Sequence, residues 1–116
     1  MITIDDFAKV ELRVGKVIEA VDVEKSEKLI RLQVDFGELG QRIIFTGVRG
    51  YGYAPADFQD KQFLFVTNIP FRKMMGQESQ GMILAVDPPS PAASEGQAGK
   101  PIFISGEGLP VGAKVR

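Results

Sequence analysis

The chain has 116 residues, a formal net charge of −1 at pH 7, and neither cysteine nor histidine. A chain of this length can bury a small core as one domain, and the two missing residue types exclude disulfides, thiolate chemistry and the commonest general base and metal ligand. No apolar run approaches the ~20 residues that span a bilayer, and the N-terminus does not resemble a signal peptide. We therefore expect a cytoplasmic protein that is not an enzyme and holds no metal or cofactor.

The charged residues are unevenly distributed along the chain. Residues 5–38 carry nine acidic and six basic residues, whereas residues 61–82 carry three basic residues and one acidic residue. The nearly neutral total gives no global field that would attract an anion. Any site for an anionic partner must therefore be a local patch, and we expect its affinity to be modest.

A short helix is predicted to begin after Thr3, because Thr3 can cap it and Asp6 lies where negative charge favours the helix dipole. Phe7 and Val10 would share one face of this helix, with Leu12 close by. This apolar face can either cap the bottom of a barrel or form a subunit interface, and the residues alone favour neither.

Five strands are predicted after the helix. In the second, Ile30, Leu32 and Val34 alternate with polar residues, so Arg31 and Gln33 should face outward. Strands with this alternation indicate an all-β domain with one buried face. The predicted strands span residues 12–23, 30–36, 41–48, 61–69 and 81–86.

Features within and between the strands indicate how they are arranged. The apolar pattern of the first strand changes phase at Gly15, which predicts a β-bulge there. Tyr51 and Tyr53, after the third strand, can either stack on bases or pack their loop onto the domain. Residues 54–60 predict one or two helical turns, with Pro55 near the start. A five-stranded barrel with a helix between strands three and four is typical of the OB-fold, which often binds oligonucleotides.

The composition changes after Asp87. Residues 88–100 are rich in proline, alanine and glycine, which predicts a loop that buries little surface. A short strand is predicted over residues 101–105, followed by a closing edge segment. We expect residues 1–116 to form a single domain, with the barrel over residues 12–87 and a C-terminal extension over residues 88–116.

The most informative stretch, residues 68–86, connects the fourth strand to the fifth. Its loop combines the adjacent cations Arg72 and Lys73 with the flexible thioethers Met74 and Met75. A buried core has little use for this mixture. The mixture suits a surface that contacts an anionic and flat partner such as RNA, because cations can follow phosphates while a thioether covers a base.

The same stretch carries a family resemblance. Arg72-Lys73-Met74 followed by Ser79-x-Gly81-Met82 resembles the signature of the tRNA-binding OB-fold domains, and residues 4–15, 26–35 and, more loosely, 110–115 resemble further motifs of that family. The family includes the C-terminal domain of bacterial methionyl-tRNA synthetase, small free-standing tRNA-binding proteins and the domain related to endothelial monocyte-activating polypeptide. The resemblance implies that Ser79 and Met82 face RNA, although Met82 begins a strand and could equally belong to the core.

Cations from separate segments support the same interpretation. In an OB barrel the second and third strands and the last connecting loop border one binding face, and the hydroxyl of Ser79 could bind phosphate or ribose. The predicted tRNA-binding residues are Lys28, Arg31, Arg42, Arg72, Lys73, Met74, Ser79 and Met82.

The resemblance further implies a homodimer that recognises tRNA by shape and backbone as an accessory to aminoacylation, with an aminoacyl-tRNA synthetase as a candidate partner and no membrane association. Since the chain starts at Met1 and lacks a synthetase signature, we expect the free-standing form. The predicted dimer interface combines apolar residues from both ends of the chain, namely Phe7, Val10, Leu12, Ile102 and Phe103.

An alternative comes from a different class of protein. Similar small dimeric OB-fold proteins serve as export-related chaperones that bind extended polypeptides. Phe71, Met74 and Met75 would then offer adaptable apolar contacts to a peptide. The Ser-Gln-Gly-Met form of the motif at residues 79–82 and the segment Lys28-Leu29-Ile30-Arg31-Leu32 resemble the tRNA-binding branch more closely, so tRNA binding is the preferred interpretation.

Overall fold

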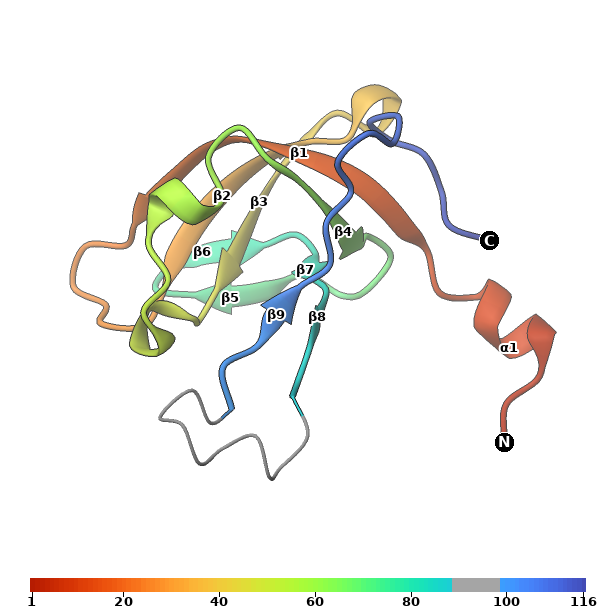
Figure 1. Ribbon diagram of the computed structural model, residues 1–116, viewed down its shortest axis with the longest axis horizontal. Coiled ribbons are helices and arrows are strands. Elements are labelled where there is room, and N and C mark those ends of the chain that lie inside the picture. The colour runs from red at the N-terminus through yellow and green to blue at the C-terminus, as the bar shows by residue number, and fades with distance from the viewer. Residues whose placement is uncertain (89–98) are drawn as a thin grey trace.

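A long first strand organises the barrel. In a computed structural model that describes residues 1–88 and 99–116, β1 (Leu12–Asp22) pairs antiparallel with β2 (Ile30–Asp35) and with β4 (Gln62–Val66) (Figure 1). β3 (Gln41–Thr46) continues the sheet beside β2, and β7 (Met82–Ile83) continues it beside β4. The strand order β3-β2-β1-β4-β7 curls into a nearly closed five-stranded barrel, which confirms the predicted all-β OB-fold.

Short elements decorate this barrel. The predicted N-terminal helix is present as α1 (Ile4–Ala8), where the Thr3 hydroxyl accepts from the amide of Asp6 at 3.1 Å and the Asp6 carboxylate accepts from the amide of Thr3. The helical turns predicted over residues 54–60 form one 3-10 turn. The remaining described elements are 3-10 turns at Gly37–Leu39, Arg49–Tyr51 and Pro55–Asp57, the pair β5 (Arg72–Met74) and β6 (Gln77–Ser79), and the pair β8 (Ala85–Val86) and β9 (Ile102–Phe103).

The core follows the predicted alternation. Ile30, Leu32 and Val34 of β2 are fully buried, whereas the residues between them are half-buried on the outer face. Phe36 and Phe65 pack edge to face inside the barrel, with ring centroids 5.3 Å apart. The barrel interior is thus filled by side chains, and a partner must bind on the outside.

The bulge predicted at Gly15 is wrong in position. The β1–β2 register shifts between Val17 and Glu19, and Gly15 itself is regularly paired with β4. A Cβ atom at Gly15 would lie 2.5 Å from a Val34 methyl and 2.7 Å from the Phe36 ring. Core packing therefore requires a glycine at position 15. The change of phase in the apolar pattern comes from the register shift between Val17 and Glu19.

The predicted fifth strand is divided in two. β7 pairs with β4, whereas β8 pairs with β9, and Leu84 lies between them. The C-terminal segment then runs along β1, where the amide of Val115 donates to the carbonyl of Leu12 at 2.8 Å and the amide of Gly112 donates to that of Val14 at 2.7 Å. Part of the loop predicted over residues 88–100 lies outside the described residues. No helix in residues 1–88 and 99–116 is long and apolar enough to cross a membrane.

Candidate nucleic-acid interface

The segment that carries the predicted cations is a β-hairpin, and the sequence-based expectation of a loop is wrong. Arg72 pairs with Ser79 across β5 and β6, and Lys73 pairs with Glu78. The two residues between the strands, Met75 and Gly76, both have positive φ, of 51° and 80°. Positive φ at both central positions is the geometry of a tight type I′ hairpin, which matches the twist of the flanking strands. The cations are therefore displayed on an ordered element.

The end of this hairpin closes the barrel against β3. The Ser79 hydroxyl accepts from the amide of Phe45 at 3.0 Å and donates to the carbonyl of Gly81 at 3.2 Å. The side-chain oxygen of Gln80 accepts from the amide of Ile43 at 2.9 Å, and the Gln80 amide donates to the Ile43 carbonyl at 2.8 Å. Because β7 is short, these bonds replace a strand ladder along the free edge of β3.

Ser79 is consequently placed inside, although the family resemblance implied an RNA-facing position. Its side chain is only 4% exposed and both of its hydrogen bonds are internal. Gly81 is equally constrained, because a Cβ there would lie 2.8 Å from the carbonyl oxygen of Val66. Met82 behaves differently, since it is 47% exposed on β7 and is not a core residue. In this chain the Ser-x-Gly part of the motif builds the fold, and Met82 reaches the surface.

Arg42 lies at the root of the hairpin. It pairs with Val34 of β2 and so points to the core side of β3, at the end of the barrel. Its guanidinium donates to the carbonyl of Thr67 at 2.6 Å and to that of Gln80 at 3.2 Å, and it lies 5.7 Å from the centroid of the Phe71 ring. These carbonyls precede and follow the hairpin, so Arg42 ties both of its ends to β3.

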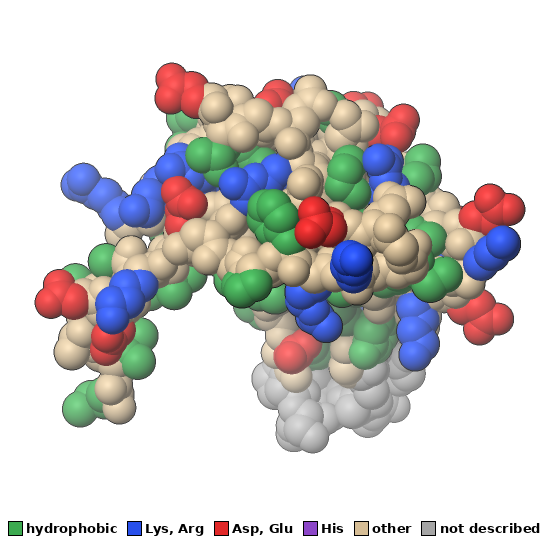
Figure 2. Space-filling model, turned by 180° about the vertical axis from the view of Figure 1, so that it is seen from behind, with side chains coloured by type: hydrophobic (Ala, Val, Ile, Leu, Met, Phe, Trp, Pro, Cys, Tyr) green, Lys and Arg blue, Asp and Glu red, His purple; other side chains and the backbone are tan. Residues whose placement is uncertain are grey.

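The remaining predicted cations differ in how freely they face solvent. Arg72, Lys73 and Lys28 are exposed, and within the described residues no carboxylate oxygen lies within 4.0 Å of their charged nitrogens. Arg31 is half-buried on β2 and forms an ion pair with Glu19 at 3.6 Å. Figure 2 shows basic side chains interspersed with hydrophobic and acidic ones on one face of the molecule.

The structure brings Arg72, Lys73 and the half-buried Met74 together on the hairpin, and sequence reasoning did not include Phe71 beside them among the RNA-binding residues. The Phe71 ring is 46% exposed. A large aromatic residue directly before two cations was the signal in the sequence that could have identified it.

The tyrosines after β3 are placed differently from each other. Tyr53 packs its ring against Phe58 and Phe103 and donates its hydroxyl to the carbonyl of Pro101. Burial raises the pKa of the Tyr53 hydroxyl above its usual value. Tyr51 is 47% exposed. Tyr53 therefore packs its loop onto the domain, and only Tyr51 offers an exposed ring.

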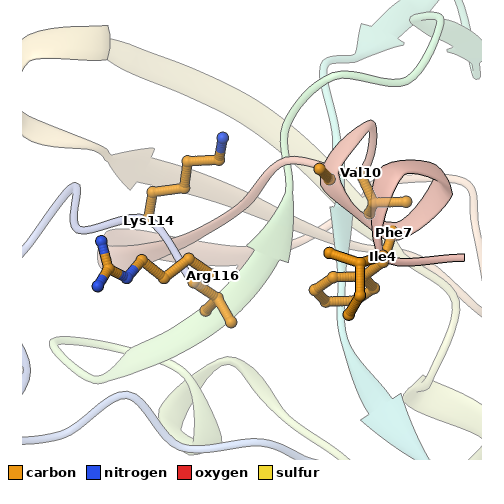
Figure 3. A pocket seen from close by; sticks show the side chains of 7 residues that line it. Ile4, Phe7, Val10, Lys114 and Arg116 are labelled. Atoms are coloured by element: carbon orange, nitrogen blue, oxygen red, sulfur yellow. The ribbon is translucent and has the colours of Figure 1, made fainter.

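A second exposed surface lies on α1, which projects beyond the end of β1 (Figure 1). None of its residues is buried, and the side chains of Ile4, Phe7 and Val10 lie along one side of it. They line an apolar hollow together with the C-terminal residues Lys114 and Arg116 (Figure 3). We call this surface the helix face.

The residues predicted for a dimer interface are not one continuous surface in the protomer. Phe7 and Val10 are exposed on the helix face, and Leu12 is half-buried at the start of β1. Ile102 is exposed on β9, which Figure 1 shows well apart from α1. Phe103 packs against the core aromatics Tyr53, Phe58 and Phe63. Of the predicted interface residues, Phe7 and Val10 therefore lie exposed together on the helix face, and Ile102 lies exposed apart from them.

A hydrogen-bond network fixes α1 to the root of the hairpin. The Asn68 side chain accepts from the amide of Glu11 at 2.8 Å and donates to the carbonyl of Lys9 at 2.6 Å. The Glu11 carboxylate binds the Arg13 guanidinium at 2.6 Å and accepts from the Thr67 hydroxyl at 2.9 Å. These hydrogen bonds, from Arg13 first and then from Thr67, hold the pKa of Glu11 below its usual value.

The described side chains form no grouping typical of a metal centre. Residues 1–88 and 99–116 contain no cluster of three or more acidic side chains that could hold a metal ion. What the geometry offers is an ordered hairpin with exposed cations, an exposed aromatic ring and a carbonyl-bound arginine. These groups can bind a phosphate backbone and a base.

The barrel and its basic hairpin define an OB-fold binding domain, the class of barrel whose surface and loops hold oligonucleotides and oligosaccharides. Residues 12–112 match the family described as "Putative tRNA binding domain", and the chain belongs to that family. The family predicted from the motifs in residues 68–86 is thus confirmed.

Similar proteins fall into two groups. A methionine–tRNA ligase of Stenotrophomonas maltophilia (strain R551-3) is 48% identical over 84 residues, which are 72% of this chain but only 12% of the ligase. A solved structure described as a MetRS-related protein from Pyrococcus horikoshii has a TM-score of 0.86 at 36% identity and covers 100% of this chain and 98% of that one. The chaperone CsaA from Bacillus anthracis str. Ames has a TM-score of 0.80 at 29% identity and covers 100% of this chain and 99% of that chain.

Proposed function

We propose that this protein binds tRNA, recognises its shape and backbone, and acts as an accessory to aminoacylation without chemistry of its own. The observation that carries the proposal is the exposure of Arg72 and Lys73 on the ordered β5–β6 hairpin. An ordered hairpin holds both charges at a fixed spacing from the barrel wall, which suits contact with successive phosphates. The cytoplasmic location expected from the sequence agrees with this ligand.

The relatives support the same ligand and a link to aminoacylation. The methionine–tRNA ligase matches this chain over 84 residues, and the Pyrococcus horikoshii protein, described as MetRS-related, matches its whole length. A domain of this kind, free or joined to a synthetase, would raise the local concentration of tRNA near the enzyme. An aminoacyl-tRNA synthetase is therefore the protein partner we propose.

The helix face is the proposed contact of a homodimer. The apolar side chains of α1 are not buried in the protomer. Exposed apolar patches often mark interfaces between subunits, and two-fold dimers are the commonest arrangement. Charges support a second copy as the occupant, because α1 carries Asp5 and Asp6 while the opposite wall of the hollow carries Lys114 and Arg116. Two-fold pairing can bring the acidic residues of one copy to the basic residues of the other.

A gel shift that compares nucleic-acid forms tests the proposed ligand. The hairpin offers few charges, so shape must contribute, and folded RNA presents unstacked loop bases and 2′-hydroxyls. We expect tRNA to bind better than duplex DNA with the same number of phosphates, with little preference among tRNA species. Equal affinity for both polymers would show that the site reads charge alone. Binding of a single tRNA species would contradict recognition of the common shape.

A second candidate function is binding of unfolded polypeptide. The similarity to chaperone CsaA and the exposed side chains of Phe71, Met75 and Met82 favour it. The same gel shift separates the two functions when an unfolded polypeptide is added as competitor. The tRNA proposal requires that tRNA binds in the absence of competitor and remains bound at equimolar polypeptide.

A further inference from the structure

Phe71 is an exposed aromatic ring with a fixed environment. It follows Pro70 and directly precedes β5, and 46% of it is exposed. The ring is not part of the buried core, which combines aliphatic side chains with other phenylalanines. Exposure alone does not indicate a ligand, because single apolar side chains are common on protein surfaces.

The second observation is that Arg42 holds this ring from one side. Its guanidinium lies 5.7 Å from the Phe71 centroid, within the range of a cation–π contact. The same guanidinium donates to the carbonyls of Thr67 and Gln80, which fix its position independently of the ring. Both hydrogen bonds come from Nη1, so this nitrogen anchors the guanidinium while its plane supports the ring.

The third observation is the charge next to the ring. Arg72 and Lys73 follow Phe71 in the chain, and both are exposed. Sites for unpaired nucleic acid combine an aromatic surface that stacks on a base with cations that follow the backbone. Phe71 and the two cations have this composition within three consecutive residues.

We propose that Phe71 binds an unpaired nucleobase by stacking, and that Arg42 is a positioning residue that holds the ring and both ends of the hairpin. This inference rests on the proposed function and adds to it a defined base-binding site. Unpaired bases of a folded RNA would supply the ligand, since paired bases are covered by their neighbours. Arg72 and Lys73 would contact the adjoining phosphates.

The first test is the affinity of Phe71 variants for tRNA, measured with the parent beside them. Phe71→Leu should weaken binding roughly 5- to 100-fold, since stacking on one base contributes in that range, while Phe71→Tyr should bind like the parent. The dependence of affinity on salt should not change in either variant, because no counterion is released by a ring. Leu109→Ala removes an equally exposed apolar side chain from another part of the surface and serves as the control.

These measurements distinguish failure of the site from failure of the function. If the parent does not bind tRNA, the proposed function fails. If the parent binds and Phe71→Leu binds equally well, the function stands and the stacking site is overturned. Melting curves establish that the variants are folded, and an exposed position should leave the melting temperature close to that of the parent.

The second test uses fluorescence, since the chain contains no tryptophan. Phe71→Trp places a single tryptophan at the proposed site, which can be excited selectively beside the two tyrosines. Stacking on a base should quench its emission as tRNA saturates the protein. Leu109→Trp is the matched control and should not respond. Saturation with tRNA that leaves the tryptophan at position 71 unquenched overturns the proposal. So does a blue shift with an unfolded polypeptide in the absence of any response to tRNA, because it would assign the ring to peptide binding.

The third test concerns Arg42. A lysine keeps the charge but lacks the planar guanidinium, which covers the ring while one of its nitrogens donates to both carbonyls. Arg42→Lys should therefore weaken binding in the parent and cause little further loss in the Phe71→Leu background. If the losses of tRNA affinity multiply in the double variant, the two residues act independently and the positioning role is overturned. Parent-like affinity of Arg42→Lys would also overturn it, because that is the result expected of a simple phosphate contact.

Discussion

Arg72 stands directly opposite Ser79 in the β5–β6 hairpin, yet the first side chain is exposed and the second is 4% exposed. Neighbouring residues of the hairpin therefore serve different purposes: some attach it to the barrel and others face solvent. Ser79 and Gln80 fasten it to the edge of β3, and Arg72 and Lys73 point into solvent. Mutations in the two groups should consequently give different results.

Ser79→Ala should destabilise the fold. The amide of Phe45 would lose its acceptor in a buried position, which costs about 1–3 kcal/mol. Chemical denaturation should show this loss. Ser105→Ala should cost less, because the Ser105 hydroxyl accepts from the Glu107 amide at an exposed position, where water can replace it. Binding of tRNA by the folded fraction should keep its salt dependence. Unchanged stability of Ser79→Ala would mean that the hydroxyl does not close the barrel.

Arg72→Ala combined with Lys73→Ala should act in the opposite way, with an unchanged melting temperature and weaker tRNA binding. Each lost phosphate contact should flatten the slope of log affinity against log salt by about 0.7 to 0.9. In the double variant the slope should therefore flatten by up to about twice this amount, and by more if both subunits of a dimer contact one tRNA.

The matched control removes two lysines elsewhere. Lys16→Ala with Lys61→Ala removes the same net charge as the hairpin double variant. The two lysines lie near the start of β4, away from the hairpin. If both double variants weaken binding alike, the hairpin has no special role and only total charge matters. If the hairpin variant keeps both the affinity and the slope of the parent, tRNA binds at another surface.

Glu11→Gln should lower stability at neutral pH by about 1 kcal/mol, since it removes a charged partner of Arg13 and Thr67. The pKa of Glu11 is depressed in the folded state, so its carboxylate stabilises the protein above the unfolded value near 4.5 and this contribution disappears as the pH falls below it. The difference in unfolding free energy between variant and parent should therefore shrink as the pH falls below 4.5. Glu24→Gln, at an exposed position, is the control, and a gap that is constant with pH would exclude a role for the charge.

The sequence predicted the features that depend on local patterns. Ile30, Leu32 and Val34 alternate with polar residues over the whole of β2, so the strand and its buried face could be read directly. The exposure of Arg72 and Lys73 also followed from their neighbours in sequence. Local periodicity and composition are sufficient for both.

Features that depend on closure of the barrel could not be predicted in this way. Ser79 is buried because β3, more than thirty residues earlier in the chain, presents the Phe45 amide to it. The type I′ turn has Met75 in a left-handed conformation, where Asn-Gly or Asp-Gly would have been the recognisable signal. The burial of Phe103 similarly depends on aromatic partners from distant segments, such as Tyr53 and Phe58.

Val10→Glu should convert the proposed dimer into a monomer. Sedimentation of the parent at micromolar concentration should give about twice the chain mass of 12.7 kDa, and a carboxylate at the centre of an apolar contact should prevent pairing. Val21→Glu is a closely matched control, since Val10 and Val21 are each 39% exposed and only Val10 lies on the helix face. The control should remain dimeric. A parent that sediments as a monomer at every concentration, or a control that dissociates as readily as Val10→Glu, would remove the helix face as the dimer contact and with it the expectation that two hairpins act on one tRNA.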